Sequence, residues 1–169
     1  NCKDYLVSNE TYEVMLNKQI EMLVTSPIPS DLSKYYDSEE YVSHHNTKKT
    51  LLNFIYNTVK KYFFKKKQNL FNDHQKNKTV LDIGTGTGDF LFYCKQKGFL
   101  VTGIEPSDIA RQQAIEKKVE VHKDLKDVLG KKFDVITMWH VLEHVPNLYE
   151  YLEQLKNLKM MVLMRKWIS

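Results

Sequence analysis

The chain has 169 residues, 42% of them hydrophobic, which is enough for one globular domain with a core and a short N-terminal extension. No apolar run approaches the roughly 18 residues that span a bilayer, and the polar start NCKDYLVSNE lacks the apolar core of a secretory signal. The net charge of +4 is modest, and two cysteines, Cys2 and Cys94, make neither a disulfide framework nor a metal cluster. We therefore expect a cytoplasmic protein that does not enter membranes.

The first part of the chain is expected to be an extension and connector covering residues 1–46. Its first 30 or so residues show weakly structured or short-strand patterns, and the prolines and serines of SPIPSDLSKYYDSEEY are typical of a linker. From 47 to 72 the apolar residues recur at spacings of three and four, which predicts an amphipathic helix. The residues of this stripe are Leu52, Ile55, Val59, Tyr62 and Phe63.

A lysine-rich stretch, KKYFFKKKQ, lies inside this helix at Lys60–Gln68. Its lysines fall mainly off the apolar stripe, which is typical of a solvated helix face. The alternative is a site for an acidic partner or nucleic acid, because clustered lysines attract phosphates. The chain has only two arginines, Arg111 and Arg165. The bidentate contacts of nucleic-acid readers are therefore scarce, and we expect no nucleic-acid partner.

Strand and helix patterns alternate over residues 78–169. The expected strands are TVLDIG, LVTGIEP, VEVHKDL and a fourth in KFDVITMWHVLEHV, which runs into a turn. The expected helices are DFLFYCKQKG, SDIARQQAIEKK and NLYEYLEQLKNL. This alternation predicts βαβ units, and right-handed crossovers would make an α/β fold with a doubly wound, Rossmann-like parallel sheet.

Three glycines, Gly84, Gly86 and Gly88, follow the first of these strands in the segment VLDIGTGTGDF. Ligands of such sheets bind at the carboxyl ends of the strands. Glycine allows positive φ and places no Cβ between the main chain and a ligand. The motif therefore predicts a loop on which a bulky ligand lies, although an ordinary tight turn is the simpler alternative.

The identity of the ligand is narrowed by the acids around the glycines. The spacing differs from the dinucleotide pattern G-x-G-x-x-G, and Asp89 stands where a phosphate-binding loop would continue with lysine. An acid there argues against phosphate and favours a cationic amine or sulfonium. Glu105 ends the second strand, where an acid accepts hydrogen bonds from both hydroxyls of a ribose. Together with Asp82 inside the motif, it makes a plain turn a poor explanation.

Four segments, VLDIGTGTGDF, VTGIEPS, HKDL and FDVITMWHVLEHVPN, together resemble class I S-adenosylmethionine-dependent methyltransferases. The similarity runs from about Lys78 to Leu158. The last segment is most similar to the small-molecule branch that includes the ubiquinone-biosynthesis O-methyltransferases. The resemblance implies an enzyme that uses S-adenosyl-L-methionine to methylate a small-molecule acceptor. It also implies a methyltransferase domain over 47–169, with a lid helix at 47–72 and a Rossmann-like core at 78–169.

The resemblance also implies roles for individual residues of the loop. The glycines Gly84, Gly86 and Gly88 would bound the loop under the methionine part of the cofactor. The carboxylate of Asp82 would help to hold that loop and the cofactor's amino group. The carboxylate of Glu105 would accept the ribose hydroxyls.

The remaining implied contacts come from later segments and from the lid. Asp124 would face the adenine amino group, with the Leu125 main chain beside the ring, although Asp124 is alternatively a solvated loop acid. Trp139 and His140 would flank the methionine and the reacting sulfonium. The segment YYDSEEYVSHH resembles the part of bacterial relatives that caps the cofactor, and its expected lid contacts are Tyr36 and Tyr41.

A general base is needed only if the acceptor must lose a proton. The segment HVLEH offers His140, Glu143 and His144 as candidates. If this turn were helical, the two histidines would share one face beside Glu143, and a metal site would be conceivable. We favour a third role, in which Glu143 and His144 fix the turn and cap the next helix. Some relatives carry zinc on paired cysteines that this chain lacks, so no metal is predicted.

The C-terminal segment LKNLKMMVLMRKWIS departs from the resemblance. Class I methyltransferases normally continue after the fifth strand, and we expect a core that lacks the last strands. An exposed sheet edge invites pairing with another chain, so a homodimer is among the expected assemblies. Two alternatives to a small-molecule enzyme remain open. One is a non-catalytic cofactor-binding or partner-binding domain, and the other is a methyltransferase that acts on RNA or protein.

Overall fold

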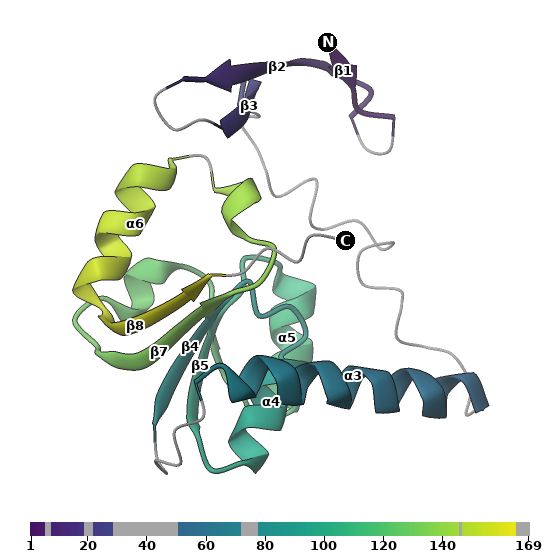
Figure 1. Cartoon of the computed structure of the whole chain (residues 1–169), viewed down its shortest axis with the longest axis vertical. Helices are drawn as coiled ribbons and strands as arrows, with labels where there is room; N and C mark the ends of the chain where they lie inside the picture. The colour runs from purple at the N-terminus through teal and green to yellow at the C-terminus, as the bar shows by residue number, and fades with distance from the viewer. Residues whose placement is uncertain (6–7, 19–21, 29–50, 72–77, 146, 165–169) are drawn as a thin grey trace. The chain divides into compact units, whose positions relative to one another are not determined.

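The computed structural model describes residues 1–5, 8–18, 22–28, 51–71, 78–145 and 147–164 (Figure 1). The chain divides into two compact units, Asn1–Ser38 and Glu39–Ser169. Our sequence boundary at residues 46 and 47 falls, like the structural one, in the segment 29–50, outside the described residues. None of the described helices combines the length and apolar character required to cross a bilayer.

The first unit is a small antiparallel sheet with the strand order β1-β2-β3. Its strands are β1 (Cys2–Lys3), β2 (Thr11–Asn17) and β3 (Met22–Ser26). Leu16 lies opposite Leu23 in the register, and Val14 lies opposite Thr25, so these side chains share one face. The apolar members of this face are exposed, because the sheet contributes too few layers to bury them. The short strands expected from the sequence are therefore present.

The second unit holds a parallel sheet with the order β6-β5-β4-β7-β8. Its strands are β4 (Thr79–Ile83), β5 (Leu100–Ile104), β6 (Glu120–His122), β7 (Phe133–Met138) and β8 (Lys159–Met164). Its helices are α3 (Leu51–Asn69), α4 (Asp89–Gln96), α5 (Asp108–Glu116) and α6 (Leu148–Asn157), with the 3₁₀ turns η2 (Leu125–Val128) and η3 (Leu142–His144). This confirms the predicted α/β fold with a doubly wound sheet.

The strand order places a topological switch between β4 and β7. The chain steps outward from β4 to β5 and β6, and then returns to the other side of β4 to form β7 and β8. At such a switch the connections leave in opposite directions, which opens a crevice at the carboxyl ends of the two strands. The glycine loop follows β4, so it lies at the edge where a ligand is expected.

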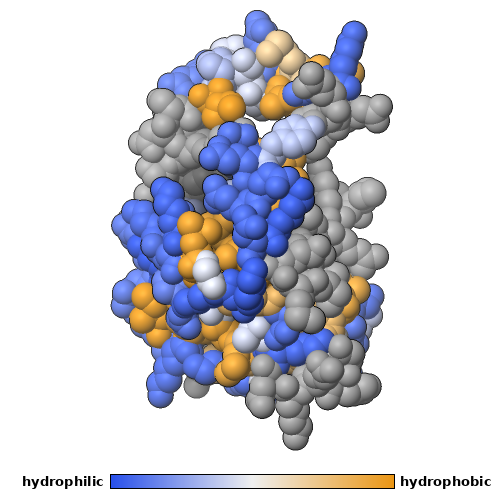
Figure 2. Space-filling view, turned by 90° about the vertical axis from the view of Figure 1, so that its left-hand side faces the viewer, coloured by the Kyte–Doolittle hydropathy of each residue, from blue (hydrophilic) through white to orange (hydrophobic). Residues whose placement is uncertain are grey.

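Two apolar layers cover the sheet. Alternate residues of each strand point to opposite faces, so Val80 packs with α3 and α4 while its neighbour Leu81 packs with α6. Figure 1 shows α3 crossing α4 on one side of the sheet and α6 on the other. On the side of α6, hydrophilic residues cover most of the described surface and the apolar areas between them are separate (Figure 2). The core therefore lies in the two layers and fixes the sheet beneath the switch.

The packing face of α3 differs from the stripe that the sequence predicts. Val59, Tyr62 and Phe63 are 46%, 55% and 41% exposed. The contact with α4 is made instead by Phe64, whose ring centroid lies 5.6 Å from that of Phe90. The buried side chain of Gln68 shares this face. The helix itself is confirmed, but Val59, Tyr62 and Phe63 are not its packing face, and the side chains of Leu52 and Ile55 lie outside the described part. The contact face carries polar residues, which a search for apolar spacing ignores.

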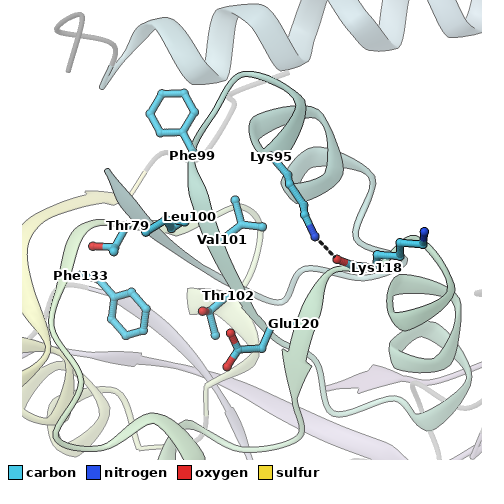
Figure 3. Close-up of a pocket in the computed structure, with 9 residues that line it drawn as sticks. All are labelled: Thr79, Lys95, Phe99, Leu100, Val101, Thr102, Lys118, Glu120 and Phe133. Atoms are coloured by element: carbon cyan, nitrogen blue, oxygen red, sulfur yellow. Dashed lines mark hydrogen bonds between the residues drawn. The ribbon is translucent and has the colours of Figure 1, made fainter. Parts of the chain in front are cut away.

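The amino edge of the sheet carries a cavity of about 260 Å³ (Figure 3). Thr79, Leu100, Glu120 and Phe133, each the first residue of its strand, line it. At its rim, the Lys95 ammonium donates a hydrogen bond to the main-chain carbonyl of Lys118. Because ligands of doubly wound sheets bind at the opposite edge, this cavity is separate from the candidate site.

Candidate functional site

The glycine loop is tied to the end of the neighbouring strand β5. The main-chain N–H groups of Gly84 and Thr85 both donate to the carbonyl of Ile104, at 2.8 and 3.1 Å. The N–H of Gly88 donates back to the carbonyl of Thr85 at 3.1 Å. These bonds fix the loop at the carboxyl edge before any ligand arrives, which is the preorganisation that tight binding needs.

The three glycines serve different purposes, although all have positive φ, at +71°, +56° and +73° in chain order. A Cβ on Gly84 would lie 2.4 Å from the Val141 side chain, and one on Gly88 would lie 2.7 Å from the Cβ of Ala114. A Cβ on Gly86 would meet no atom of the described residues within 4 Å. Gly88 therefore allows packing inside the protein, Gly84 allows the close approach of Val141, and Gly86 leaves space above the main chain.

Glu105 lies beside Gly86 and is only 7% exposed. Its Oε2 accepts the N–H of Gly86 at 2.7 Å, and its Oε1 accepts the N–H of Ser107 at 3.0 Å. Arg111 holds the same residue from behind by donating to its main-chain carbonyl at 2.8 Å. An ionised carboxylate offers about four acceptor positions. The oriented carboxylate can therefore also accept hydrogen bonds from ligand hydroxyls.

Asp82 lies under the loop rather than on its open side. Its carboxylate is 2% exposed and accepts the hydroxyl of Thr137 from β7 at 2.6 Å. Burial raises the pKa of Asp82 to about 6, although the bond from Thr137 and the positive charge of Lys67 oppose the rise. The residue thus joins the two strands at the switch, in keeping with the predicted support of the loop. Its contact with a cofactor amino group stays a prediction.

Asp89 corrects one sequence interpretation. We expected this acid to favour a cationic ligand, but its cations come from the protein itself. Its Oδ1 lies 2.8 Å from the Lys117 ammonium, and its Oδ2 lies 2.5 Å from that of Lys60. Burial opposes ionisation, yet the hydrogen bonds and charges of the two lysines lower the pKa of Asp89 to about 2. Asp89 therefore anchors α3 to the first turn of α4, and Lys60 does not belong to a solvated face.

Asp124 and Leu125 follow β6, as the sequence indicates. Asp124 is the N-cap of η2: its Oδ1 accepts the N–H of Lys126 at 3.0 Å, and its own N–H donates to Asp127 at 3.1 Å. Its side chain is 50% exposed, whereas Leu125 is buried. The cap explains this acid without any ligand. The contact of Asp124 with adenine therefore stays a prediction.

Trp139 and His140 follow the end of β7 at Met138. The Trp139 ring is buried, with the Lys67 ammonium 4.3 Å from its centroid. Within the described part of the chain, its Nε1 has no hydrogen-bond partner. His140 is exposed and has a φ of +58°, which is uncommon for a residue with a Cβ. Both residues lie beside the loop, and their contacts with the methionine part of a cofactor stay predictions.

The segment HVLEH does not form one continuous helix. The 3₁₀ turn η3 covers only Leu142–His144, and the positive φ of His140 excludes this residue from it. His140 and His144 therefore do not share a helical face, which removes the geometry on which the metal alternative depended. In the described ranges, no three histidine, cysteine or acidic side chains come together as a metal site would require.

The expected lid residues Tyr36 and Tyr41 lie outside the described residues.

Sequence reasoning missed Lys67 and Thr137, which meet Trp139 and Asp82 at the switch. A signal for Lys67 was present, since it follows Lys60 by two turns and Phe64 by one on the face that packs against α4. For Thr137, parallel pairing of TVLDI with FDVITM places it beside Asp82. Both signals become visible only once the strand register and the helix face are known.

Comparison with known proteins agrees with this geometry. A family model described as a methyltransferase domain matches residues 56–160, more than half of the chain. The ubiquinone biosynthesis O-methyltransferase of Haemophilus ducreyi is 38% identical over 95 residues, which are 48% of this chain and 40% of that protein. The chain spans less than half the length of the curated relatives that it matches.

Two solved structures share the fold. The plantazolicin methyltransferase BpumL, in complex with a pentazolic desmethylPZN analog and SAH, is 26% identical with a TM-score of 0.51, covering 80% of this chain and 53% of that one. The magnesium protoporphyrin IX methyltransferase of Synechocystis PCC 6803, with bound SAM, is 19% identical with a TM-score of 0.54, covering 75% of this chain and 67% of that one. With a family model that matches most of its second unit, the chain belongs to the class I S-adenosylmethionine-dependent methyltransferases.

Proposed function

We propose that this chain carries the cofactor site of an enzyme that transfers a methyl group from S-adenosylmethionine to a small-molecule acceptor. One observation carries the proposal: the open main chain at Gly86 and the buried, oriented carboxylate of Glu105 lie side by side at the switch. The structures of BpumL with SAH and of the Synechocystis enzyme with SAM support the choice of cofactor. The name of the Haemophilus relative supports a small acceptor.

The residues present fit this cofactor. A buried carboxylate that two main-chain N–H groups hold in a fixed direction is a hydrogen-bond acceptor of the type that ribose hydroxyls require. The space above Gly86 accepts a group that a side chain would exclude. S-Adenosylmethionine supplies a methyl group already activated on a sulfonium. The protein is therefore required to bind, orient and exclude water rather than to create a reactive group.

His140 is the proposed base for an acceptor that must lose a proton. It is exposed directly after β7, beside the loop, and its left-handed main chain turns the segment away from the strand. An unusual backbone conformation at such an edge is a reason to test for function. Imidazole is the side chain that most often serves as a general base. Glu143 and His144 lie in η3 and remain secondary candidates.

The lysines of α3 argue against an RNA substrate. Lys60 is committed to Asp89, and Lys67 is committed to the ring of Trp139. The basic surface of the run is therefore smaller than its composition indicates, which reduces the phosphate contacts that nucleic-acid binding requires.

The proposal also includes a cytoplasmic location, which Cys2 and Cys94 favour because neither forms a disulfide. The proposal does not fix the oligomeric state, for which a homodimer is one expectation.

Calorimetric titration of the chain with S-adenosylmethionine, S-adenosylhomocysteine and NAD tests the proposal. We expect binding of the first two and none of NAD, and binding of NAD alone would overturn it. Turnover is then followed by release of S-adenosylhomocysteine with a panel of phenolic and carboxylate acceptors. Cofactor binding without turnover on any acceptor would favour the non-catalytic alternative. A His140→Ala variant that keeps binding but loses turnover would support the proposed base.

A further inference from the structure

Lys67 occupies an unusual place in the packed face of α3. Its ammonium nitrogen lies 4.3 Å from the ring centroid of Trp139 and 5.5 Å from that of Phe90. The residue is half-buried, and burial lowers the pKa of its amine, whereas the nearby negative charge of Asp82 opposes that fall. From its place in α3, Lys67 thus reaches Trp139, which directly follows β7 at the switch.

A cation in this position requires an explanation. Burial of an ammonium group is costly unless other groups compensate for the lost water. In the described part of the chain the compensation comes from two ring faces and from the negative charge of Asp82. A methionine would fill the same volume without that cost. The charge itself therefore has a role beyond filling space.

Trp139 is the group on which this charge acts most directly. The ring of Trp139 contacts that of Phe90 edge to face, at 6.1 Å between centroids, and the Lys67 ammonium lies closer, 4.3 Å from the indole centroid. The indole Nε1 has no hydrogen-bond partner within the described ranges, so no polar bond there sets the orientation of the ring. A cation centred over the ring prefers one orientation of it, because the attraction comes from the ring's negative face.

We propose that Lys67 is a positioning residue, which fixes the Trp139 ring from α3 and thereby couples the seating of this helix to ligand binding at the glycine loop. The proposal rests on the proposed function in one respect, namely that the bound cofactor reaches Trp139. The coupling is reciprocal. A seated α3 presents an ordered Trp139 to the ligand, and a bound ligand holds α3 in place.

The first experiment reads the contact without any ligand. The chain has two tryptophans, Trp139 and Trp167, so a Trp167→Phe background leaves Trp139 as the only indole. Acrylamide quenching and the emission maximum are measured for Lys67→Met, Lys67→Arg and a matched control, Lys66→Met. Lys66 is exposed on the same helix, with its ammonium 4.9 Å from the ring centroid of Tyr62.

We expect stronger quenching and a shifted emission for Lys67→Met, and little change for Lys67→Arg and Lys66→Met. Arginine keeps both the charge and the contact with the ring face. Identical spectra for Lys67→Met and its parent would overturn the proposal. If Lys67→Met loses its cooperative melt, the spectrum of Trp139 in Lys67→Arg alone distinguishes the two roles. A role in filling space predicts that the larger guanidinium disturbs Trp139, whereas the positioning role predicts that it does not.

The second experiment measures the coupling by titration with S-adenosylhomocysteine. The dissociation constant should rise about tenfold in Lys67→Met, on the scale of one partly desolvated cation–π contact. It should stay within about twofold in Lys67→Arg, because arginine makes the same contact, and should not change in Lys66→Met. If the parent binds and Lys67→Met binds equally well, the inference fails while the proposed function stands. If the parent itself does not bind, the proposed function fails.

Discussion

The glycines at the two ends of the loop and the glycine in its middle have different surroundings. At its ends, the side chain of Val141 lies where a Cβ on Gly84 would point, and Gly88 packs against Ala114 of α5. Directly after the loop, Asp89 is clamped by two lysines. In the middle, no atom of the residues that the structure describes lies within 4 Å of where a side chain on Gly86 would begin. The N–H of Gly86 donates to the carboxylate of Glu105.

This difference shows that one motif contains two kinds of glycine. The end glycines are constrained by packing: a side chain on Gly88 would meet the main chain of α5 at Ala114, and one on Gly84 would meet the side chain of Val141. The middle glycine has a positive φ as well, but no packing contact among the described residues requires it. Substitutions at the ends should therefore mainly change stability, whereas a substitution in the middle should change binding in addition to the modest cost of its backbone conformation.

The largest expected effect is the loss of folding in Gly88→Val. A Cβ at Gly88 would lie 2.7 Å from the Ala114 Cβ and 3.2 Å from its Cα, at a φ of +73°. Overpacking and a disallowed backbone each cost on the order of 1–3 kcal/mol, and β-branching makes both worse. Circular-dichroism melts should lose their cooperative transition. The control is Gly98→Val, at a φ of +89° in open space, and equal melts for the two variants would contradict the packing role.

The acids that flank the loop should show opposite dependences on pH. Burial raises the pKa of Asp82 to about 6, so the folded state binds its proton more tightly than the unfolded chain does. The free energy of unfolding should therefore fall as pH rises from about 4 to about 6, by roughly 2–3 kcal/mol for this group. Asp82→Asn should remove this fall and raise stability at pH 7. The amide oxygen can still accept the hydroxyl of Thr137.

Asp89 provides the contrast for that experiment. Its pKa is lowered to about 2, because the two lysines outweigh the effect of burial. Its stabilising contribution is therefore present above the ordinary carboxyl pKa and is lost as pH falls toward 2. Asp89→Asn should lower the free energy of unfolding at pH 7, opposite in sign to Asp82→Asn. Urea unfolding between pH 4 and 7 measures both variants. If both substitutions changed the free energy of unfolding in the same direction, Asp82 and Asp89 would not hold the loop by different means.

Replacement of Glu105 tests the acid that lies beside Gly86 in the middle of the glycine loop. Glu105→Ala removes the acceptor of the Gly86 N–H together with the proposed ribose contacts, and should weaken S-adenosylhomocysteine binding by about 1.5–3 kcal/mol. Glu105→Gln should lose part of this binding free energy, because an amide NH₂ group, which donates hydrogen bonds, replaces one of the two carboxylate oxygens. Calorimetry gives both values. The control is Glu120→Gln, an exposed acid on β6 paired with Lys131, which should bind normally. Unchanged binding in Glu105→Ala would remove the ribose role.

Much of the fold could be predicted from the sequence, because the β-strand and helix patterns after residue 78 are local. TVLDI and FDVITM are short and rich in β-branched and other apolar residues, and the helix expected in SDIARQQAIEKK begins directly after Ser107, whose hydroxyl accepts the N–H of Ala110 at 3.4 Å. Such signals depend on a few neighbouring residues. The glycine loop could be placed for the same reason, since it follows β4 directly.

The contacts of the site were harder to predict because they join distant segments. Asp89 meets Lys60 across 29 positions, and Asp82 meets Thr137 across 55. No local pattern states which lysine will meet which acid, so Asp89 was assigned to a ligand instead of to the protein. The packing face of α3 was missed for a related reason. Its contact residues include Lys67 and Gln68, whose polar character hides them from any search for an apolar stripe.

The smallest expected effect is also the most direct test of the open middle. Gly86→Ala and Gly130→Ala both place a methyl group at positive φ, +56° and +87°, and within the described ranges neither methyl meets an atom within 4 Å. Each should therefore lower the free energy of unfolding by a similar amount, about 1 kcal/mol. Only Gly86→Ala should weaken S-adenosylhomocysteine binding, by about tenfold, because its methyl enters the space assigned to the cofactor. Gly130 follows η2 and takes no part in the loop. Matched melts with unequal binding would establish that the middle glycine is kept open for a ligand, whereas equal binding would mean that the whole loop serves the fold.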